Sequence, residues 1–363
     1  MIRILSYILI AFLLSACSAG NLNVEGKVSD GKIADGDSIF LVATQQSGES
    51  RIVGRTVVRN AAFHFSTDAE TPCICSVVTY TREGAVKNKV DFVADSSWVG
   101  VSISAARDIL TGSTLNGELQ RVNDSLFLVK EIYTRYHNKK RDIPTLSQMA
   151  VQEADDVMAV TAMYSSGVVT RAIERNMGNK LAPYFIKKYN GIISPADCVR
   201  MIEALPAQEK EDVVIKYLHN LYSGVLNTAI GKPYVDFVQA TADGKSCRFS
   251  DIAGRGKDVI LSIWSSGIKA SVNGQKMLKE LLVRKGDALA LVAVSLDTSY
   301  NTWCVSMSDN ALAGTQLTDL RGWQNEVLQL YGIDRCPYYV LVDGAGVVRY
   351  RGDNIAEMEK ILE

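Results

Sequence analysis

The chain has 363 residues, of which 47% are hydrophobic and 22% charged, so it is long enough to form two or three domains with cores of their own. It contains only seven prolines and no low-complexity tract, which is the composition of a folded protein. Lys and Arg together number 39 and Asp and Glu 40, without a long run of either sign. Nucleic-acid binding needs a basic stripe that displaces counterions from phosphates, so this balance argues against a nucleic-acid partner.

The N-terminal residues have the pattern of a cleaved secretory signal. Arg3 gives a positive start, residues 4–14 form a nearly unbroken apolar run, and residues 14–17 (Leu-Ser-Ala-Cys) end it. The run is too short for a permanent membrane span. Its ending resembles the lipobox of bacterial lipoproteins, in which cleavage leaves a diacylglyceryl-modified cysteine at the new N-terminus. We therefore expect a signal peptide over residues 1–16 and a lipidated N-terminus over residues 17–22, with the lipid on Cys17.

The lipid on Cys17 is expected to anchor the protein, since each buried methylene group contributes about 0.8 kcal/mol. Ser18, with no acidic run after it, resembles the sorting signal for an outer-membrane anchor that faces the periplasm of the cell envelope. No later segment approaches about 18 consecutive apolar residues, so the rest of the chain is expected in water. An ordinary secretory signal with an incidental cysteine is the alternative.

Residues 23–115 are predicted to form a β-domain. Short segments rich in β-branched and aromatic residues recur about every ten residues, and turn signals such as Arg59-Asn60 separate them. These segments lie at residues 38–43, 52–58, 62–65, 76–80 and 90–93. The spacing predicts an antiparallel β-sandwich of about seven strands. Residues 24–28, 59–63 and 112–116 also resemble a β-domain of unknown function that precedes thioredoxin-like domains in envelope lipoproteins.

Residues 116–227 are predicted to be helical, because their apolar residues recur at steps of three and four. Ser194 is expected to cap a helix that has Pro195 at its first position, and residues 213–226 supply the last helix. We expect these helices to form a bundle or spacer between two flanking domains, with their apolar stripes in the core.

Six cysteines follow Cys17 in the sequence: Cys73, Cys75, Cys198, Cys247, Cys304 and Cys336. Export would permit disulfides. Cys73 and Cys75 are two residues apart in an apolar run, so on a strand they point to the same face, which disfavours a bond between them. We expect them to be buried thiols outside any disulfide, a common state for cysteine.

Residues 228–363 are predicted to form an α/β domain. Two continuous apolar runs, at residues 258–264 and 289–296, are typical of strands buried on both faces of a sheet. The predicted order is strand, helix, strand, helix, strand, strand and helix, over residues 258–264, 277–282, 289–296, 323–331, 336–343, 347–350 and 355–362.

This order resembles the thioredoxin fold, and more specifically the membrane-anchored thioredoxin-like proteins of the alkyl hydroperoxide reductase/thiol-specific antioxidant superfamily. The resemblance covers residues 228–363. It rests on the order and spacing of residues 231–237 (GKPYVDF), 263–266 (IWSS), 294–297 (VSLD) and 331–337 (YGIDRCP). The last segment matches the one that carries the family's cis-proline, so the resemblance implies a cis peptide bond between Cys336 and Pro337.

Members of this family carry a C-x-x-C motif where the helix after the first strand begins. The partial positive charge of a helix N-terminus lowers the pKa of a thiol there and makes a thiolate available at neutral pH. In this chain the two positions are Ile268 and Ser271, four and seven residues after Trp264. Neither can form a thiolate, so the dithiol–disulfide cycle and a peroxidase reaction lack their reactant here. Ser271 is expected to be the N-cap of the helix instead.

Two other thiols are expected near the same edge of the domain. A Cys304–Cys336 disulfide and a lone reactive thiol at Cys336 are alternatives to a partly buried Cys336 packed beside Pro337. Apart from these two thiols, no catalytic residue is expected. A copper site like that of some thioredoxin-fold chaperones needs a histidine, and His64, His137 and His219 all precede residue 228. No metal and no cofactor are therefore expected.

Three functions are compatible with these observations. The favoured one is a thioredoxin-fold envelope lipoprotein without dithiol redox activity that binds a protein or peptide at the groove beside the cis-proline, where relatives bind extended peptides. The second is a thiol-disulfide oxidoreductase that uses Cys336, with or without Cys304. The third is a structural envelope component that binds through its β-domain. For the favoured function, the expected binding residues are Trp264, Ser265, Ser266, Cys336 and Pro337.

Overall fold

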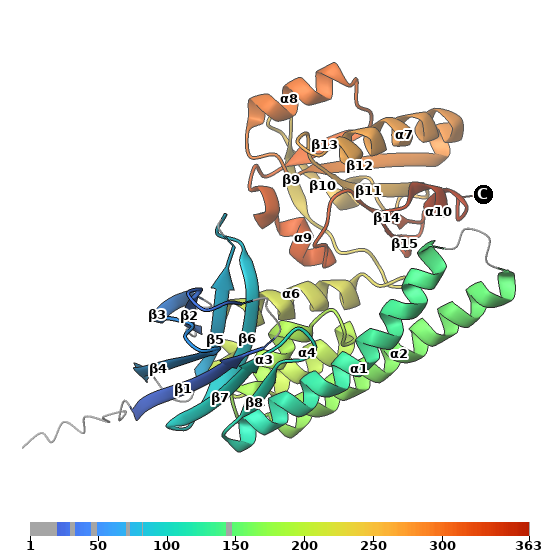
Figure 1. Cartoon of the computed structure of the whole chain (residues 1–363). Helices are drawn as coiled ribbons and strands as arrows, with labels where there is room; N and C mark the ends of the chain where they lie inside the picture. The colour runs from blue at the N-terminus through green and yellow to red at the C-terminus, as the bar shows by residue number, and fades with distance from the viewer. Residues whose placement is uncertain are drawn as a thin grey trace, which may run out of the picture. The chain divides into compact units, whose positions relative to one another are not determined.

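The computed structural model describes residues 20–29, 33–44, 49–69, 73–81, 83–142 and 147–362. The predicted signal peptide and the predicted lipid attachment at Cys17 lie outside these residues. The chain forms two compact units, Met1–Lys188 and Tyr189–Glu363 (Figure 1). None of the helices in the described part of the chain combines the length and the apolar character that a membrane span needs.

The first unit contains two four-stranded sheets, with strand orders β4-β1-β7-β8 and β3-β2-β5-β6. The strands are β1 Gly20–Val28, β2 Ser38–Thr44, β3 Ser50–Val57, β4 Ala62–Ala69, β5 Cys73–Tyr80, β6 Val86–Ala94, β7 Trp98–Ile103 and β8 Ile109–Thr111. Neighbouring strands are antiparallel, as predicted, except that β1 and β7 run parallel. The antiparallel prediction is corrected at this pair, where β1 lies between β4 and β7 and hydrogen-bonds to both. The sandwich packing of the two sheets stays a prediction.

The strands of the first unit follow the alternation of apolar and polar residues. In β7, Val99, Val101 and Ile103 are buried, whereas the residues between them are partly exposed. Side chains such as Val24 of β1 and Leu41 of β2 are completely buried, so they belong to the core of this unit.

The segment at residues 59–63 forms a tight turn that an antiparallel bridge between Arg59 and Ala62 closes, and it connects β3 to β4, which belong to different sheets. Asn60 and Ala61 both have positive φ, at 52° and 56°, which is the backbone of the tight turns that match the twist of paired strands. The Asp35 carboxylate accepts hydrogen bonds from both of their amides at 2.8 Å. These two bonds help to offset the strain of a left-handed alanine.

Two long helices, α1 Thr114–Asp142 and α2 Gln148–Arg175, pack against each other in the first unit. They are antiparallel, because Lys140 near the end of α1 pairs with Asp155 near the start of α2 and Arg175 pairs with Glu118. Asn116 joins α1 to the sheet: its side chain accepts from the amide of Val93 and donates to the carbonyl of the same residue, both at 2.8 Å.

The second unit is built on a seven-stranded sheet with the order β10-β9-β13-β12-β11-β14-β15. Its strands are β9 Val238–Thr241, β10 Ser246–Arg248, β11 Asp258–Trp264, β12 Leu289–Ser295, β13 Thr315–Thr318, β14 Tyr338–Val342 and β15 Val348–Gly352. β11 pairs with β12 in parallel and with β14 in antiparallel orientation. Together with the helices between them, these strands give the thioredoxin-like arrangement that the sequence predicts.

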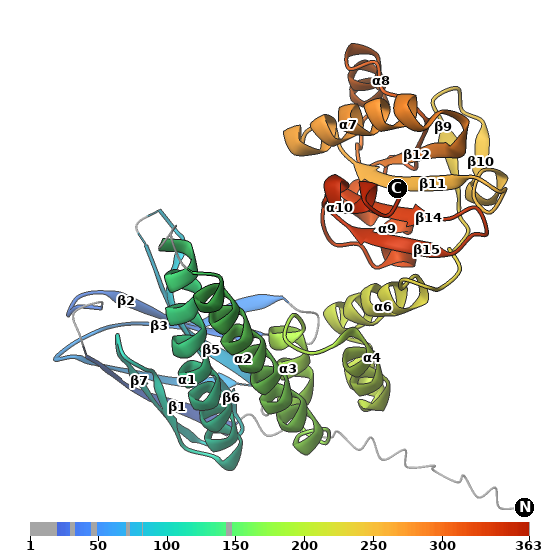
Figure 2. The same ribbon diagram turned by 90° about the vertical axis from the view of Figure 1, so that its right-hand side faces the viewer.

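Helices cover both faces of this sheet (Figure 2). On one face, α7 Lys269–Lys285 and α10 Ile355–Glu359 pack on Ile260 and Leu341 through residues such as Leu278 and Met358. On the other face, α9 Glu326–Tyr331 packs on the strands through a second cluster that includes Tyr331. Strands β11 and β12 are therefore buried on both sides, which explains their continuous apolar sequences.

The segment predicted as a helical spacer contributes helices to both units. Helix α3, Leu181–Tyr189, follows α2, and α4 Pro195–Ala204, α5 Ala207–Lys210 and α6 Val213–Asn227 belong to the second unit. Ser194 caps α4 as predicted and accepts a hydrogen bond from the amide of Asp197 at 3.1 Å. Helix α6 packs closely on α9, since a Cβ on Gly224 would lie 2.2 Å from the carbonyl oxygen of Gln329.

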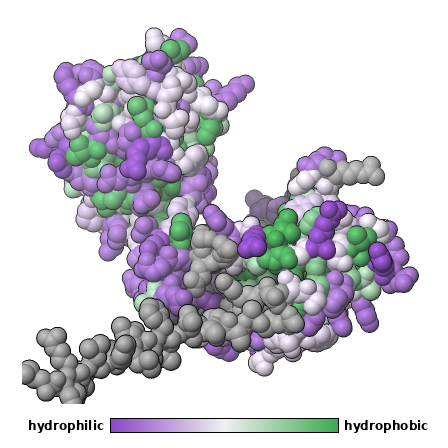
Figure 3. Space-filling view, turned by 90° about the vertical axis from the view of Figure 1, so that its left-hand side faces the viewer, coloured by the Kyte–Doolittle hydropathy of each residue, from purple (hydrophilic) through white to green (hydrophobic). Residues whose placement is uncertain are grey.

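Helix α8, Tyr300–Asp309, and strand β13 are two elements that the sequence did not predict. Helix α8 has only one buried side chain, Trp303, so it shows no apolar stripe. Its start is fixed by Ser299, whose hydroxyl accepts from the amide of Thr302. The surface of the protein shows small apolar patches among hydrophilic side chains on the face drawn in Figure 3.

Candidate functional site

The site predicted by the resemblance lies in the second unit, where β11 and β12 end and α7 begins. The residues between β11 and α7 are Ser265, Ser266, Gly267 and Ile268, and Ile268 is the N-cap residue of α7. A turn bond from the amide of Ile268 to the carbonyl of Ser265 at 3.2 Å closes the loop. The two positions that the resemblance assigns to the C-x-x-C motif are therefore at the N-cap and in the first turn of the helix, where a thiol would be activated.

The carboxylate of Asp297, just after β12, holds this loop. It accepts hydrogen bonds from the hydroxyls of Ser265 at 3.0 Å, Ser266 at 2.9 Å and Ser295 at 2.9 Å. The amide of Ser266 also donates to it, at 3.1 Å. Only 8% of Asp297 is exposed. The hydroxyls of the loop thus serve to hold the carboxylate, and the carboxylate fixes the loop on the end of the sheet.

Ser271 is not the helix N-cap, so that prediction is wrong. The N-cap is Ile268, without a side-chain hydrogen bond, and Ser271 lies in the first turn of α7 and is fully buried. Its hydroxyl accepts from the amide of Ser265 at 2.8 Å. The hydroxyl of Ser271 thus accepts a hydrogen bond from an amide outside the helix, six residues earlier, which the local rule for helix caps does not predict.

Cys336 faces the same part of the helix. Its thiol donates to the hydroxyl of Ser271 at 3.7 Å and to the carbonyl of Ile263 at 3.6 Å. Burial raises the pKa of this thiol to about 11, although the contact with Ser271 lowers it. The peptide bond between Cys336 and Pro337 is cis, as predicted. At neutral pH Cys336 is therefore almost entirely a protonated, half-buried thiol.

Cys304 lies in a different cluster from Cys336. It packs from α8 against the residues around Trp264 and Trp303, whereas Cys336 packs against the cluster that contains Tyr331. Neither cysteine is in a disulfide. The structure therefore holds Cys304 and Cys336 as two separate reduced thiols.

The five residues predicted to bind a partner differ in exposure. Ser265, Ser266, Cys336 and Pro337 are half-buried; the two serines belong to the loop, and Cys336 contacts Ser271 just after it. Trp264 is completely buried and contacts Trp303 and Ala293 beneath it. Trp264 therefore supports the loop from below, and any effect of this side chain on binding is indirect. Asp297 and Ser295 were not among the predicted site residues, because their contacts form only when β11 and β12 lie side by side.

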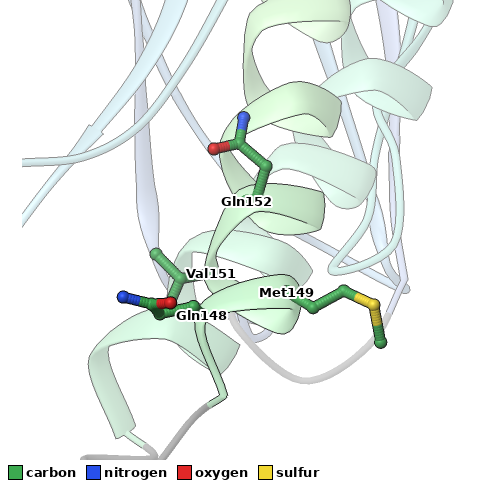
Figure 4. Close-up of a pocket in the computed structure, with 4 residues that line it drawn as sticks. All are labelled: Gln148, Met149, Val151 and Gln152. Atoms are coloured by element: carbon green, nitrogen blue, oxygen red, sulfur yellow. The ribbon is translucent and has the colours of Figure 1, made fainter.

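Other features of the described residues offer less chemistry. No group of three or more His, Cys, Asp or Glu side chains could hold a metal ion there. A surface depression at the start of α2 is lined by Gln148, Met149, Val151 and Gln152, from one stretch of helix (Figure 4). A second depression, between β3 and β4, includes Arg59 and His64. Neither brings together the residues that hydrolysis or redox chemistry would need.

Comparisons with known proteins found only distant similarities. No family model matches the chain, and no curated protein matches it. Among solved structures, a C-terminal domain of a candidate thiol-disulfide oxidoreductase from Bacteroides thetaiotaomicron is 23% identical, covers 38% of this chain and 95% of its own, and has a TM-score of 0.35. A thiol-disulfide oxidoreductase from Bacteroides fragilis is 20% identical over 36% and 99% of the two chains, with a TM-score of 0.33.

A third similar structure is the thioredoxin domain of a thiol-disulfide oxidoreductase from Bacteroides vulgatus. It is 22% identical, covers 37% of this chain and 99% of its own, and has a TM-score of 0.33. All three similarities cover only the C-terminal part of the chain.

Proposed function

We propose that the second unit binds a protein or peptide segment on the surface formed by the Ser265–Ile268 loop and the Cys336–Pro337 segment, without dithiol redox activity. The observation that carries this proposal is the chemistry of the loop. The C-x-x-C positions hold Ile268 and Ser271, and the serine hydroxyls of the loop are bound to Asp297. The nearby thiol has a pKa of about 11, so a thiolate is scarce at neutral pH.

A disulfide-exchange cycle needs a thiolate that attacks and a second thiol that resolves the mixed disulfide. Ile268 and Ser271 provide neither. The loop and the Cys336–Pro337 segment together present a small surface of hydroxyl, aliphatic and thiol groups, which suits contact with a peptide backbone and apolar side chains better than covalent chemistry. That relatives bind extended peptides at this place is an argument by analogy of fold.

Selection from a peptide library displayed on phage tests this proposal with the full chain. Ile268→Asp places a carboxylate in the middle of the proposed surface, while Asp at an N-cap favours the helix, so α7 should stay folded. Selected peptides should lose binding to Ile268→Asp. They should keep binding to Val283→Asp, a matched change at an exposed position on the same helix. Failure to select any peptide, or equal binding to both variants, would contradict the proposal.

A thiol reaction at Cys336 is the second candidate. Two observations favour it: Cys336 is half-buried and faces the first turn of α7, and its hydrogen bond to Ser271 lowers the pKa of its thiol. This candidate predicts that Cys336→Ser abolishes disulfide reduction by the second unit. The peptide-binding proposal predicts no effect of Cys336→Ser on that reaction.

We further propose that the protein is held in the cell envelope by a lipid on Cys17, at the outer membrane and facing the periplasm. This proposal rests on the apolar run over residues 4–14 and the lipobox-like ending at Cys17. Cys17→Ser should move the protein from the detergent phase to the soluble fraction or leave it unprocessed. An unchanged membrane fraction for Cys17→Ser would refute lipid anchoring.

A further inference from the structure

Two cysteines of the first unit lie next to each other, although the sequence disfavours a bond between them. Cys73 and Cys75 are on the same face of β5, and their sulfur atoms are 3.5 Å apart in a thiol–thiol hydrogen bond. Neither is in a disulfide. The resemblance places a cysteine pair in the second unit, which has no C-x-x-C motif. The two neighbouring thiols, Cys73 and Cys75, are instead in the first unit.

The two thiols differ in access because the two sides of β5 are covered to different extents. Cys75 pairs with Ala43 of β2 on one side and Phe92 of β6 on the other, and it is completely buried. Cys73 pairs with Ala94 of β6, whereas the pairing of β5 with β2 ends at Ile74 within the described residues. Cys73 is accordingly only half-buried, so a reagent reaches its sulfur first.

The hydrogen bond also distinguishes the two thiols chemically. The contact with Cys73 and then burial hold the pKa of the Cys75 thiol far above its ordinary value. Cys75 therefore keeps its proton and can donate it to the sulfur of Cys73. The difference in burial assigns attack on an external disulfide to the more accessible Cys73 and resolution of the mixed disulfide to Cys75.

A disulfide bond between Cys73 and Cys75 is sterically possible but strained. Residues two apart on one face of a strand have Cα atoms roughly 6.4–6.8 Å apart. Disulfides span Cα separations of about 4.4–6.8 Å, so this pair lies at the upper limit of the range. Strained disulfides are more readily reduced than relaxed ones, so the bond should be labile and not a permanent crosslink.

We propose that Cys73 and Cys75 form a reversible dithiol–disulfide pair that exchanges with small-molecule disulfides, with Cys73 as the attacking and Cys75 as the resolving residue. In the forward direction the Cys73 thiolate attacks one sulfur of the external disulfide. The external S–S bond breaks, one external thiolate leaves and takes up a proton, and a mixed disulfide remains on Cys73.

The thiol of Cys75 then loses its proton and attacks the sulfur of Cys73 in the mixed disulfide. The Cys73–Cys75 bond forms, and the second external thiol leaves with a proton. The pair loses two electrons and two protons, which the external disulfide gains as it becomes two thiols. The reverse sequence lets the strained bond oxidise an external dithiol. None of these steps uses the second unit, so the inference holds or fails independently of the proposed peptide binding.

Disulfide mapping of the full chain tests the pair without any mutation. The protein is equilibrated in buffers of reduced and oxidised glutathione, quenched in acid, alkylated and analysed by mass spectrometry of the peptide that contains residues 73–75. The expected result is loss of both alkylation sites in oxidised glutathione and their recovery in reduced glutathione. Retention of both alkylation sites in every buffer would overturn the proposal, as would a bond that reduced glutathione does not reverse.

Two variants test the roles of the cysteines. Cys75→Ser removes the resolving thiol, so Cys73 should keep a stable glutathione adduct, whereas Cys73→Ser should leave Cys75 unmodified because it is buried. Cys198→Ser is the matched control, since Cys198 is another completely buried thiol and its loss should leave the pair unchanged. The opposite pattern, with an adduct only in Cys73→Ser, would overturn the assignment. If a variant fails to fold, the wild-type mapping still decides whether the bond forms.

Discussion

Replacing Asp297 with alanine tests whether this carboxylate holds the loop at the candidate site. The carboxylate accepts from the hydroxyls of Ser265, Ser266 and Ser295 and from the amide of Ser266. A hydrogen bond to a charged group contributes about 1.5–3 kcal/mol. The loop serines are half-buried, so water can replace much of what they lose, but Ser295 is completely buried. We therefore expect Asp297→Ala to lower the free energy of unfolding of the second unit by about 2–3 kcal/mol.

Urea unfolding followed by tryptophan fluorescence measures this loss. Of the four tryptophans, Trp98 is in the first unit and Trp264, Trp303 and Trp323 are in the second, so the signal reports mainly on the unit that contains the site. Asp297→Asn retains an acceptor oxygen and should cost less than Asp297→Ala. Asp309→Ala, at an exposed position of the same unit, is the control and should change stability by less than about 0.5 kcal/mol. If Asp297→Ala is as mild as Asp309→Ala, the carboxylate does not hold the loop.

Three further predictions concern packing and thiol reactivity. Gly224→Ala should destabilise the second unit by about 1–3 kcal/mol or more in calorimetry, because its Cβ would lie 2.2 Å from the carbonyl oxygen of Gln329, whereas Gly117→Ala, with open space around it, should not destabilise the first unit. Asn116→Ala should lower the stability of the first unit by about 2–4 kcal/mol in urea, since the backbone amide and carbonyl of Val93 lose their buried partner; a change below that of a surface substitution would refute this role. At pH 7, iodoacetamide should react with the thiol of Cys336 more slowly than it reacts with the thiol of glutathione, because the raised pKa leaves little thiolate on Cys336. The alkylation rate of Cys336 should keep rising until the pH exceeds about 11, and a rate that already levels off near pH 9 would contradict this prediction.

Local patterns predict much of this fold because they reflect burial. The continuous apolar run of β11 and the cap at Ser194 depend on the residues themselves, and both are where the sequence places them. Helix α8 was missed because it buries only Trp303 and shows no apolar stripe. The parallel pairing of β1 with β7 joins strands about seventy residues apart, and no local rule encodes which strand an N-terminal strand will pair with.

The candidate site was only partly predictable for the same reason. Ile268 and Ser271 follow from counting along a strand and helix. The role of Asp297 depends on β11 and β12 lying side by side, and the hydroxyl of Ser271 bonds to the amide of Ser265 and not to its own helix. The spacing in the sequence places Cys73 and Cys75 on one face of a strand. The distance of 3.5 Å between their sulfur atoms and their unequal burial depend on the neighbouring strands.

The rate of insulin reduction in dithiothreitol tests the central claim, that the second unit has a thioredoxin-like scaffold without dithiol chemistry. The full chain is used with Cys73→Ser and Cys75→Ser, so that this pair cannot contribute. We expect no reduction above background and no change on adding Cys336→Ser. Introducing Ile268→Cys and Ser271→Cys together with Cys336→Ser should create activity, because the serine prevents a bond from residue 336 to the new cysteine at position 271. If the protein with Cys73→Ser and Cys75→Ser reduces insulin and loses this activity with Cys336→Ser, Cys336 is a reactive thiol and the second unit does have thiol redox activity.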